Sequence, residues 1–572
     1  MKANILIYIF AAITAVGCTP LTQMAVPTEH IVMFDSFGKP VNPTGNLFCC
    51  ESINPDNKQI LRKEYHTDLL SYTEESSDQY EVHLNKILEN IKDFKTIRNK
   101  QGKVVKRILL FIHGGLNTQV DSINRVVEPF DDGYCEPTST CKTRFERIKD
   151  KAFFPLFINW KSSLISSYWE SLFWLRQGES APWTAPFTSP FTLATDVGRS
   201  LLRWPMVFGN LIYNDITTIP TIPTIPTIPK YPETIAKELL CHHLYPNAVD
   251  SAEYKKCLND KTGLTFRKAP FPCPFDSEGI PGNNSPVKTE VSGNGSYSDK
   301  KTLPVHIGDD ERECRQLLTN FALYWPTLPA KLLTTPVVDA FGTSSWDVMF
   351  RHVDLLFQTE DELRESGFTS NAEKLANMPK HGGLSLLLEK LSEKIQGDKT
   401  VDWEITLVGH SMGTIVINQL IRQFGNILPI KNIVYLAAAT SVHDYEDTIY
   451  PYLSAHPDSK IYHFMLHPRA ESEENMGFEL ASRGSLLVWV DNFLSKPLSP
   501  LDRTVGRYDN LFPAFHNADQ SIRDQIFLHV YRAGNNVKNT DPQTHSDVAA
   551  RFKFWEEECW QPNPKIKNCI IP

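Results

Sequence analysis

The chain has 572 residues, of which 41% are hydrophobic and 22% are charged. This length exceeds that of a minimal domain and suffices to bury a large core, and the composition is that of a globular protein. The formal net charge of −9 argues against binding to nucleic acid, which requires a basic face. Aromatic residues make up 11% of the chain, which is compatible with an apolar binding pocket and equally with a large core.

The amino terminus has the pattern of an export signal over residues 1–18. Lys2 provides a short positive segment, and Ile5 to Val16 is an apolar stretch too short to span a bilayer, which takes about 20 residues. It ends in Ala15-Val16-Gly17-Cys18, which resembles the lipobox of bacterial lipoproteins. The resemblance implies cleavage before Cys18, lipidation of that cysteine and, because Thr19 follows, a place in the cell envelope at the outer membrane. An ordinary cleaved signal with a coincidental cysteine is the alternative.

The cysteines also point to an oxidising compartment. Apart from Cys18 there are ten of them, an even number, and none belongs to a Cys-x2-Cys pair of the kind that binds metals. We expect disulfides between Cys135 and Cys141 and between Cys559 and Cys569, because each pair closes a short loop. The sequence does not determine the other pairings, and scattered buried thiols are the alternative.

Apolar runs alternate with helical patterns in the segment that follows the signal, residues 19–160. Residues 30–34, 104–112 and 153–158 are expected strands, because they are short, mostly apolar and rich in branched or aromatic side chains. Residues 82–97 have the spacing of an amphipathic helix.

Four more apolar runs lie in the last part of the chain, residues 401–572. They are expected strands separated by helical or loop-rich stretches, and they comprise residues 404–408, 433–436, 461–466 and 526–531. Buried strands that alternate with helices predict an α/β fold with a doubly wound, mostly parallel sheet.

Residues 161–400 do not continue this alternation and are expected to form a large insertion over the carboxyl edge of the sheet. It has two aromatic-rich segments, a Thr-Ile-Pro repeat that predicts a stiff polyproline-type spacer, and a flexible Gly-, Asn- and Ser-rich loop. These are residues 169–175 and 201–208, residues 218–229, and residues 282–301. A separate inserted domain is the alternative.

The strongest signal for chemistry is a strand, a tight turn and a helix around Ser411. An expected strand runs into Gly409-His410-Ser411-Met412-Gly413, and a helical pattern follows from Thr414 to Phe424. Such a turn needs small residues on both sides of the serine, because the neighbouring backbone would otherwise clash. It presents the serine Oγ at the sheet edge and aims the helix amino terminus at a developing oxyanion. Ser411 is therefore the candidate nucleophile.

This Gly-x-Ser-x-Gly motif, in its strand–turn–helix context, resembles the nucleophile elbow of the α/β-hydrolase superfamily, and of its lipase and esterase branch in particular. The resemblance covers residues 104–160 and 403–550, roughly. It implies the chain order nucleophile, acid, histidine, so that the acid and the histidine follow Ser411.

The same resemblance implies an oxyanion hole of two backbone N–H groups. One is that of Met412. The other comes from the loop after the strand 104–112, where His113-Gly114-Gly115-Leu116-Asn117 is similar to the His-Gly-Gly turns of esterases. Gly115 is the expected donor in this loop, with Leu116 as the alternative.

His545 is the expected catalytic histidine. It lies in the loop Asp541 to Asp547, beyond the last expected strand, from where its side chain can reach Ser411 and act as general base. The other histidines after the serine fit less well, because they lie inside a strand, in an apparent excursion or before the last strand. These are His529, His516, His443, His463 and His467.

The expected acid is Glu471, the first carboxylate after the strand 461–466, which is the family's usual position. Other carboxylates compete with it. They are Glu473, Glu474 and, at a position that some lipases use, Asp444, with Asp491 and Asp502 next in line.

Together these residues predict a serine hydrolase that cleaves carboxylic esters through an acyl-serine intermediate. The aromatic insertion and the expected lipid anchor favour an apolar acyl group and a membrane-held enzyme. A peptidase or thioesterase on the same fold is the nearest alternative, and an inactive surface-binding lipoprotein is the alternative from another class. No metal-ligand spacing or phosphate loop is present in the sequence, so no metal and no cofactor is expected. Residues Phe341 to Asp347 are expected to form a structural turn.

Overall fold

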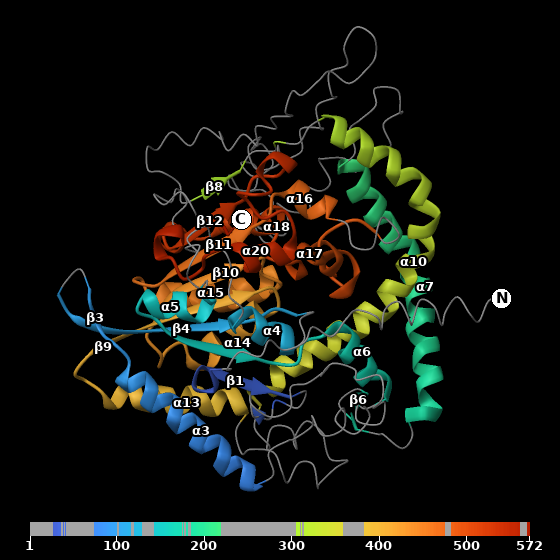
Figure 1. The fold of residues 1–572 in the computed structure, drawn as a ribbon. Helices are drawn as coiled ribbons and strands as arrows, with labels where there is room; N and C mark the ends of the chain where they lie inside the picture. Colours follow the sequence, from blue (N-terminus) through green and yellow to red (C-terminus); the bar gives the residue numbers. More distant parts are fainter. Residues whose placement is uncertain are drawn as a thin grey trace, which may run out of the picture.

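The computed structural model describes residues 27–35, 38, 40–41, 74–99, 102–115, 119–127, 142–173, 175–176, 179–180, 185–218, 305–308, 311, 314–358, 382–474, 482–560 and 569–571. They form an α/β fold in which helices flank a mostly parallel sheet (Figure 1).

The sheet has ten strands in the described part of the chain. Their order is β2-β1-β5-β4-β9-β10-β11-β12-β8, with β3 paired to β4. Eight strands run parallel to their neighbours, whereas β2 and β3 are antiparallel. The strands are β1 (Ile31–Phe34), β2 (Pro40–Val41), β3 (Ile97–Arg98), β4 (Val104–Ile112), β5 (Phe154–Asn159), β8 (Val305–Ile307), β9 (Asp402–His410), β10 (Ile430–Leu436), β11 (Lys460–Met465) and β12 (Ile526–Val530). A separate two-stranded ribbon joins β6 (Leu175–Arg176) and β7 (Glu179–Ser180).

Each of the seven apolar runs predicted as a strand forms one, with its ends shifted by at most three residues. The prediction succeeds because a parallel strand covered by helices on both faces must be apolar at nearly every position. Every residue of β1 and of β5 is buried.

The strand order reverses between β4 and β9. From β4 the chain moves to β5 on one side, and it later returns to β9 on the other side and continues outward through β10, β11 and β12. In open α/β sheets, the crevice beyond the carboxyl ends of the strands at such a reversal is where ligands bind. Ser411 follows the carboxyl end of β9, and Gly114 follows that of β4.

The helices connect these strands and cover the sheet (Figure 1). They are α3 (Glu74–Asp93), α4 (Gln119–Val127), α5 (Arg144–Asp150), α6 (Leu164–Phe173), α7 (Ala185–Thr218), α10 (Cys314–Leu355), α13 (Gly383–Gly397), α14 (Gly413–Phe424), α15 (Val442–Ala455), α16 (Pro468–Glu473), α17 (Leu486–Trp489), α18 (Tyr508–Asn517), α19 (Gln520–Arg523) and α20 (His545–Arg551), with a π-helical turn, η3 (Val490–Leu494), after α17. Among the described residues, no helix combines the length and the apolarity needed to cross a bilayer.

The described parts of residues 161–400 consist mainly of long helices, and they also contribute to the sheet. The strand β8 pairs with β12 at one edge, and α13 packs against α3, where the Tyr80 hydroxyl donates to the Gly383 carbonyl at 2.7 Å. The Thr-Ile-Pro repeat beyond residue 218 and the loop 282–301 lie outside the described residues, as does the export signal with Cys18.

The turn predicted for Phe341 to Asp347 is wrong, since these residues lie within α10. Their hydroxyl groups are satisfied inside the helix: Ser345 donates to the Phe341 carbonyl and Thr343 to the Asp339 carboxylate, each one turn back. Gly342 lies close to η3, since a Cβ there would lie 2.3 Å from a methyl group of Leu494. The small polar residues therefore permit close helix packing, where the sequence alone suggests a break.

Cys559 and Cys569 form a disulfide with a Cα–Cα distance of 5.5 Å, as predicted from their spacing. The bridge joins η6 (Glu557–Trp560) to the end of the chain, where Phe552 pairs with Ile570. The predicted partners Cys135 and Cys141 lie outside the described residues.

Replacing both Cys559 and Cys569 by alanine should lower the free energy of unfolding by about 2–3 kcal/mol, because the bridge restricts a short loop of the unfolded chain. Urea denaturation of the variant and of the wild type, with and without a reductant, measures this. Equal denaturation midpoints for the variant, the oxidised wild type and the reduced wild type would contradict a stabilising bridge.

Candidate active site

The turn between β9 and α14 holds Ser411 in a strained conformation. Its φ is +49°, in the left-handed region that residues other than glycine rarely adopt. Hydrogen bonds on both sides maintain this conformation: Ser411 N donates to the Leu436 carbonyl at 2.9 Å, and the Ser411 carbonyl accepts from Ala439 N at 3.1 Å. The loop after β10 therefore fixes the turn.

The two glycines of the motif are required by close contacts. A Cβ on Gly413 would lie 2.3 Å from the Ile112 carbonyl oxygen at the end of β4. A Cβ on Gly409 would lie 2.7 Å from a methyl group of Ile417 and 3.1 Å from the Gly413 backbone. The start of α14 thus sits directly against β4 and β9, as the sequence motif predicts.

The loop after β4 lies against Ser411. A Cβ on Gly114 would be 2.7 Å from the Ser411 Cβ, and a Cβ on Gly115 would be 2.7 Å from the Met412 sulfur. Neither the Met412 N–H nor the Gly115 N–H donates a hydrogen bond to another described residue. The two predicted oxyanion donors therefore come from adjoining backbone segments, and Leu116, the alternative donor, lies outside the described residues.

The orientation of the peptide between Gly114 and Gly115 is fixed by two hydrogen bonds. His113 Nε2 accepts from Trp160 N at 3.1 Å, so the neutral ring carries its proton on Nδ1, which donates to the Gly114 carbonyl at 2.8 Å. Ser162 Oγ donates to the same oxygen at 3.0 Å. Because a peptide group is planar and trans, the Gly115 N–H must point the opposite way from this carbonyl.

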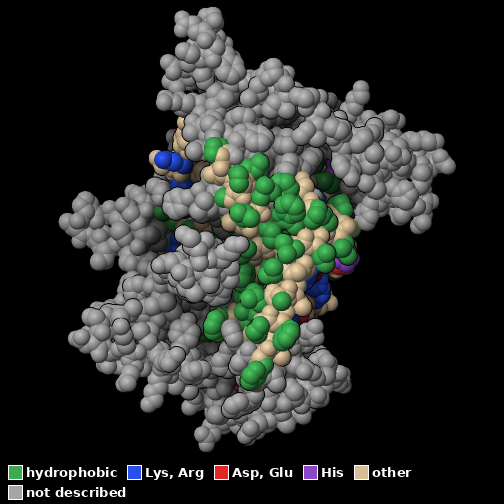
Figure 2. All heavy atoms as spheres, turned by 90° about the vertical axis from the view of Figure 1, so that its right-hand side faces the viewer, with side chains coloured by type: hydrophobic (Ala, Val, Ile, Leu, Met, Phe, Trp, Pro, Cys, Tyr) green, Lys and Arg blue, Asp and Glu red, His purple; other side chains and the backbone are tan. Residues whose placement is uncertain are grey.

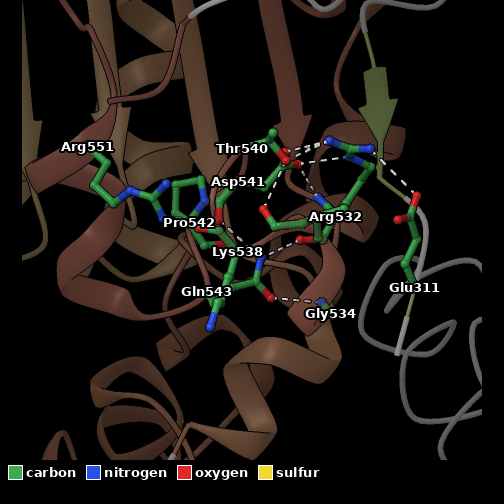
Figure 3. A network of polar contacts seen from close by, with 10 residues as sticks. Glu311, Arg532, Gly534, Lys538, Thr540, Asp541, Pro542, Gln543 and Arg551 are labelled. Atoms are coloured by element: carbon green, nitrogen blue, oxygen red, sulfur yellow. Dashed lines mark hydrogen bonds and ion pairs between the residues drawn. The ribbon is translucent and has the colours of Figure 1, made fainter. Parts of the chain in front are cut away.

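His545 is the first residue of α20 rather than part of a loop, because Thr544 caps the helix by accepting from Asp547 N. The segment before it is held by a polar network (Figure 3). Arg532 Nη2 donates to Asp541 at 2.9 Å, and Gln543 accepts from Gly534 N at 2.8 Å. The network defines the path of the chain from β12 to His545.

The structure brings His545 to the serine turn. Its ring lies 5.1 Å from that of His410, the neighbour of Ser411, and His410 Nε2 donates to the His545 carbonyl at 3.4 Å. Among the described residues, Ser411 Oγ and both ring nitrogens of His545 have no hydrogen-bond partner, so the two are not directly bonded here. Ser411 is fully buried and His545 is 6% exposed, which makes this a closed site.

The histidines of the site are neutral at physiological pH. Burial, with a smaller contribution from the Arg125 charge, lowers the pKa of His545 to about 4. Burial also places the pKa of His410 well below its usual value and lowers that of His113 to about 4. Sequence reasoning missed Arg125: it lies on α4, and no motif connects that helix with the serine.

Glu471, the predicted acid, is fully buried on α16 and does not contact the His545 ring. Its carboxylate accepts from Ser485 Oγ, and its other oxygen has no partner among the described residues. Burial raises the pKa of Glu471 to about 8. Glu474 is the carboxylate that reaches His545: one of its oxygens accepts from His545 N at 2.8 Å, and burial raises its pKa to about 7.

The remaining carboxylates considered from the sequence serve other contacts. Ser441 caps α15 by accepting from Asp444 N, and the Asp444 carboxylate accepts from Asn418, Thr440 and Arg422. Asp491 accepts from Thr504 N, Arg507 and Asn510, and Asp502 accepts from Ser499 N, which caps the short helix that follows it. The rival histidine His529 lies within β12 and stacks on His306.

A pocket of ≈ 170 Å³ lies between α10, α14 and α15, where Phe350, Ile415 and Asp444 contribute to its wall. Neither Ser411 nor His545 lines it. In the part of the chain that the structure describes, no group of three or more His, Cys, Asp or Glu side chains is placed to hold a metal ion.

No protein-family model, no curated protein and no solved structure matches this chain.

Replacing Glu471 by glutamine should change how stability depends on pH. Between about pH 4.5 and 8 the folded state binds a proton at Glu471 that the unfolded state has lost, so the wild type loses stability as the pH rises, by at most about 1.4 kcal/mol per pH unit. Below this window both states are protonated. Urea denaturation should show that the free energy of unfolding of the variant rises relative to that of the wild type from pH 5 to pH 8. A difference between the two proteins that does not change with pH would contradict the raised pKa of Glu471.

Proposed function

We propose that this protein is a serine hydrolase of the α/β-hydrolase type that cleaves carboxylic esters through an acyl-serine intermediate. The observation that carries the proposal is the placement of Ser411. It lies in a left-handed turn at the carboxyl end of β9, where the strand order reverses, with Gly114 packed against its Cβ. A strained serine with a glycine backbone packed beside it is the arrangement that nucleophilic acyl transfer requires.

In the proposed reaction, Ser411 Oγ attacks the ester carbonyl carbon while His545 takes the hydroxyl proton. The carbonyl oxygen becomes an oxyanion and accepts from the N–H groups of Met412 and Gly115. The tetrahedral intermediate then collapses, the alcohol leaves with the proton held by His545, and an acyl-serine forms. Water, deprotonated by His545, attacks the acyl carbon, and the acid is released with regeneration of Ser411.

Two features of the site support these roles. The peptide between Gly114 and Gly115 is held by His113 and Ser162, so its N–H is oriented before substrate binds and need not reorganise during the reaction. The neutral state of His545 is the one that accepts a proton. The Arg125 charge, which opposes protonation of His545, favours negative charge at the oxyanion.

We propose Glu474, rather than the first-ranked Glu471, as the carboxylate that orients His545. Glu474 accepts a hydrogen bond from the backbone N–H of His545, so its carboxylate already lies next to this residue. Glu471 is bonded to Ser485 instead. An ionised carboxylate near the ring would raise the pKa of His545 from its low value and so strengthen it as a base.

The cell-envelope location and the lipid anchor at Cys18 also stay proposals, and with them the preference for an apolar acyl group. They are supported by the lipobox-like sequence and by a disulfide between Cys559 and Cys569, a bond typical of exported proteins. A peptidase or thioesterase activity of the same site, and an inactive binding protein, are the outcomes against which the proposal is tested.

Ser411→Ala should abolish hydrolysis of a short p-nitrophenyl ester, with a loss of at least about 10³-fold in kcat, and should abolish labelling by a fluorophosphonate probe. The exposed Ser521 of α19 provides a matched control, and Ser521→Ala should keep wild-type activity and labelling. A wild type that neither turns over esters nor is labelled is a binding protein. A Ser411→Ala variant that keeps a tenth of the wild-type turnover has another nucleophile.

Glu474→Gln should lower kcat by about 10²- to 10⁴-fold, because the amide can still accept from His545 N but cannot stabilise the imidazolium. Glu471→Gln is the control, because it is the same substitution at a neighbouring carboxylate, and its kcat should stay near that of the wild type. Steady-state kinetics on the same ester decides between them. An impaired Glu471→Gln beside an active Glu474→Gln would return the acid to the position first favoured by the sequence.

A further inference from the structure

Large apolar side chains are exposed together on one face of α7 and α10, and Figure 2 shows them as a nearly continuous band of hydrophobic atoms. Leu202 is 86% exposed, Phe187 79% and Leu333 77%. The other members are Phe191, Leu201, Met206 and Val337. We call these seven residues the apolar face. Patches of this extent on a protein surface mark interaction sites.

The exposed positions of these two helices carry almost no polar group. On α7 between residues 187 and 209 the exposed side chains are uncharged, and only Thr195 has a hydroxyl. They are Phe187, Pro190, Phe191, Ala194, Thr195, Leu201, Leu202, Pro205, Met206 and Gly209. On α10 between residues 326 and 340 they are Pro326, Pro329, Leu333 and Val337.

The charged residues of the same stretches point mainly toward neighbouring helices, and Arg199, whose side chain is 36% exposed, is the most exposed of them. Arg203 pairs with Asp339 of α10 at 3.2 Å, and the Asp339 side chain is only 2% exposed. Asp196 accepts from the Tyr168 hydroxyl of α6 and pairs with Arg199. Lys331 of α10 is buried as well.

This polarity is the reverse of that of a helix pair in water. A surface helix normally buries its apolar stripe and exposes its charges, and a buried ion pair adds a desolvation cost. Where lipid surrounds a group of helices, ionisable side chains face the interior of the bundle and pair with one another, and apolar side chains lie on the outside.

We propose that the apolar face of α7 and α10 docks onto the surface of a lipid bilayer. The face lacks the hydrogen-bonding and charged side chains that give a protein interface its specificity, at about one hydrogen bond per 100–200 Å². Acyl chains need no such partner. Since no helix among the described residues is apolar and long enough to cross a bilayer, these helices lie in the interface rather than span it.

This contact is separate from the lipid anchor proposed at Cys18 and does not depend on the proposed hydrolase activity. The test therefore uses the full chain with Cys18→Ala, which cannot be lipidated, and measures binding rather than turnover. The chain is sedimented with vesicles of phosphatidylcholine, a lipid without net charge, at low and at high salt.

The Cys18→Ala chain should sediment with the vesicles at both salt concentrations. Adding Phe187→Ser, Phe191→Ser and Leu202→Ser should reduce the partition coefficient at least tenfold. Because these side chains are exposed, the variant should keep the circular dichroism and denaturation midpoint of its parent. The control adds Val82→Ser and Leu498→Ser, which are 68% and 96% exposed but lie outside the apolar face, and should bind like the parent.

A Cys18→Ala chain that stays in the supernatant would overturn the proposal, as would a triple variant that binds like its parent. Light scattering of the same samples identifies the competing occupant. A stable dimer of the parent that the triple variant abolishes, without vesicle binding, would assign the face to a second copy of the chain.

Discussion

The contact between the serine turn and the carboxyl end of β4 is the constraint on which the site depends. Gly413 is packed against the Ile112 carbonyl, and Gly114 against the side chain of Ser411, at distances that leave no room for a Cβ. Ser411 adopts the left-handed region in this turn, and the loop after β4 lies beside it. One backbone contact between two neighbouring parallel strands thus brings together the proposed nucleophile and the proposed oxyanion donors.

The rest of the sheet supports this contact from both sides. The loop after β10 accepts from and donates to the Ser411 backbone, and the segment after β5 holds the Gly114 carbonyl through Ser162. Trp160 connects the same segment to His113 with two hydrogen bonds, one from its backbone and one from its indole. Four adjacent strand ends, those of β5, β4, β9 and β10, therefore contribute to a preorganised backbone.

Burial dominates the electrostatics of the site. It keeps His113, His410 and His545 neutral and raises the pKa of Glu471 and of Glu474 to about 8 and about 7. In this closed state the imidazoles and Glu471 are neutral at physiological pH, which avoids unpaired buried charge, whereas Glu474 ionises close to that pH. A reaction that develops an oxyanion and an imidazolium together gains from the same low dielectric, because opposite charges then attract strongly. The helix α10 links the site to the apolar face, since its Met349 lies beside Gly115 while its Leu333 is exposed.

The sequence by itself determined the strands, the serine turn and one disulfide of this protein. These features depend on residues close together in the chain: apolar runs for strands buried on both faces, glycines on either side of Ser411, and two cysteines near one another. It also indicated the loop at Gly114 and Gly115, because a short glycine pair after a buried strand has few other uses.

The tertiary structure decided the rest, because those features join residues far apart in the chain. Which carboxylate approaches His545 depends on how α16 packs, and three glutamates within four positions, Glu471 to Glu474, are indistinguishable by pattern. The effect of Arg125 on His545 and the hydrogen bond from Ser162 to Gly114 both depend on how segments far apart in the chain pack together. The reversed polarity of α7 and α10 could not be predicted from the sequence either, because it depends on how these helices pack. A helical sequence shows which residues share a face, but only packing decides whether that face meets the core, water or another surface.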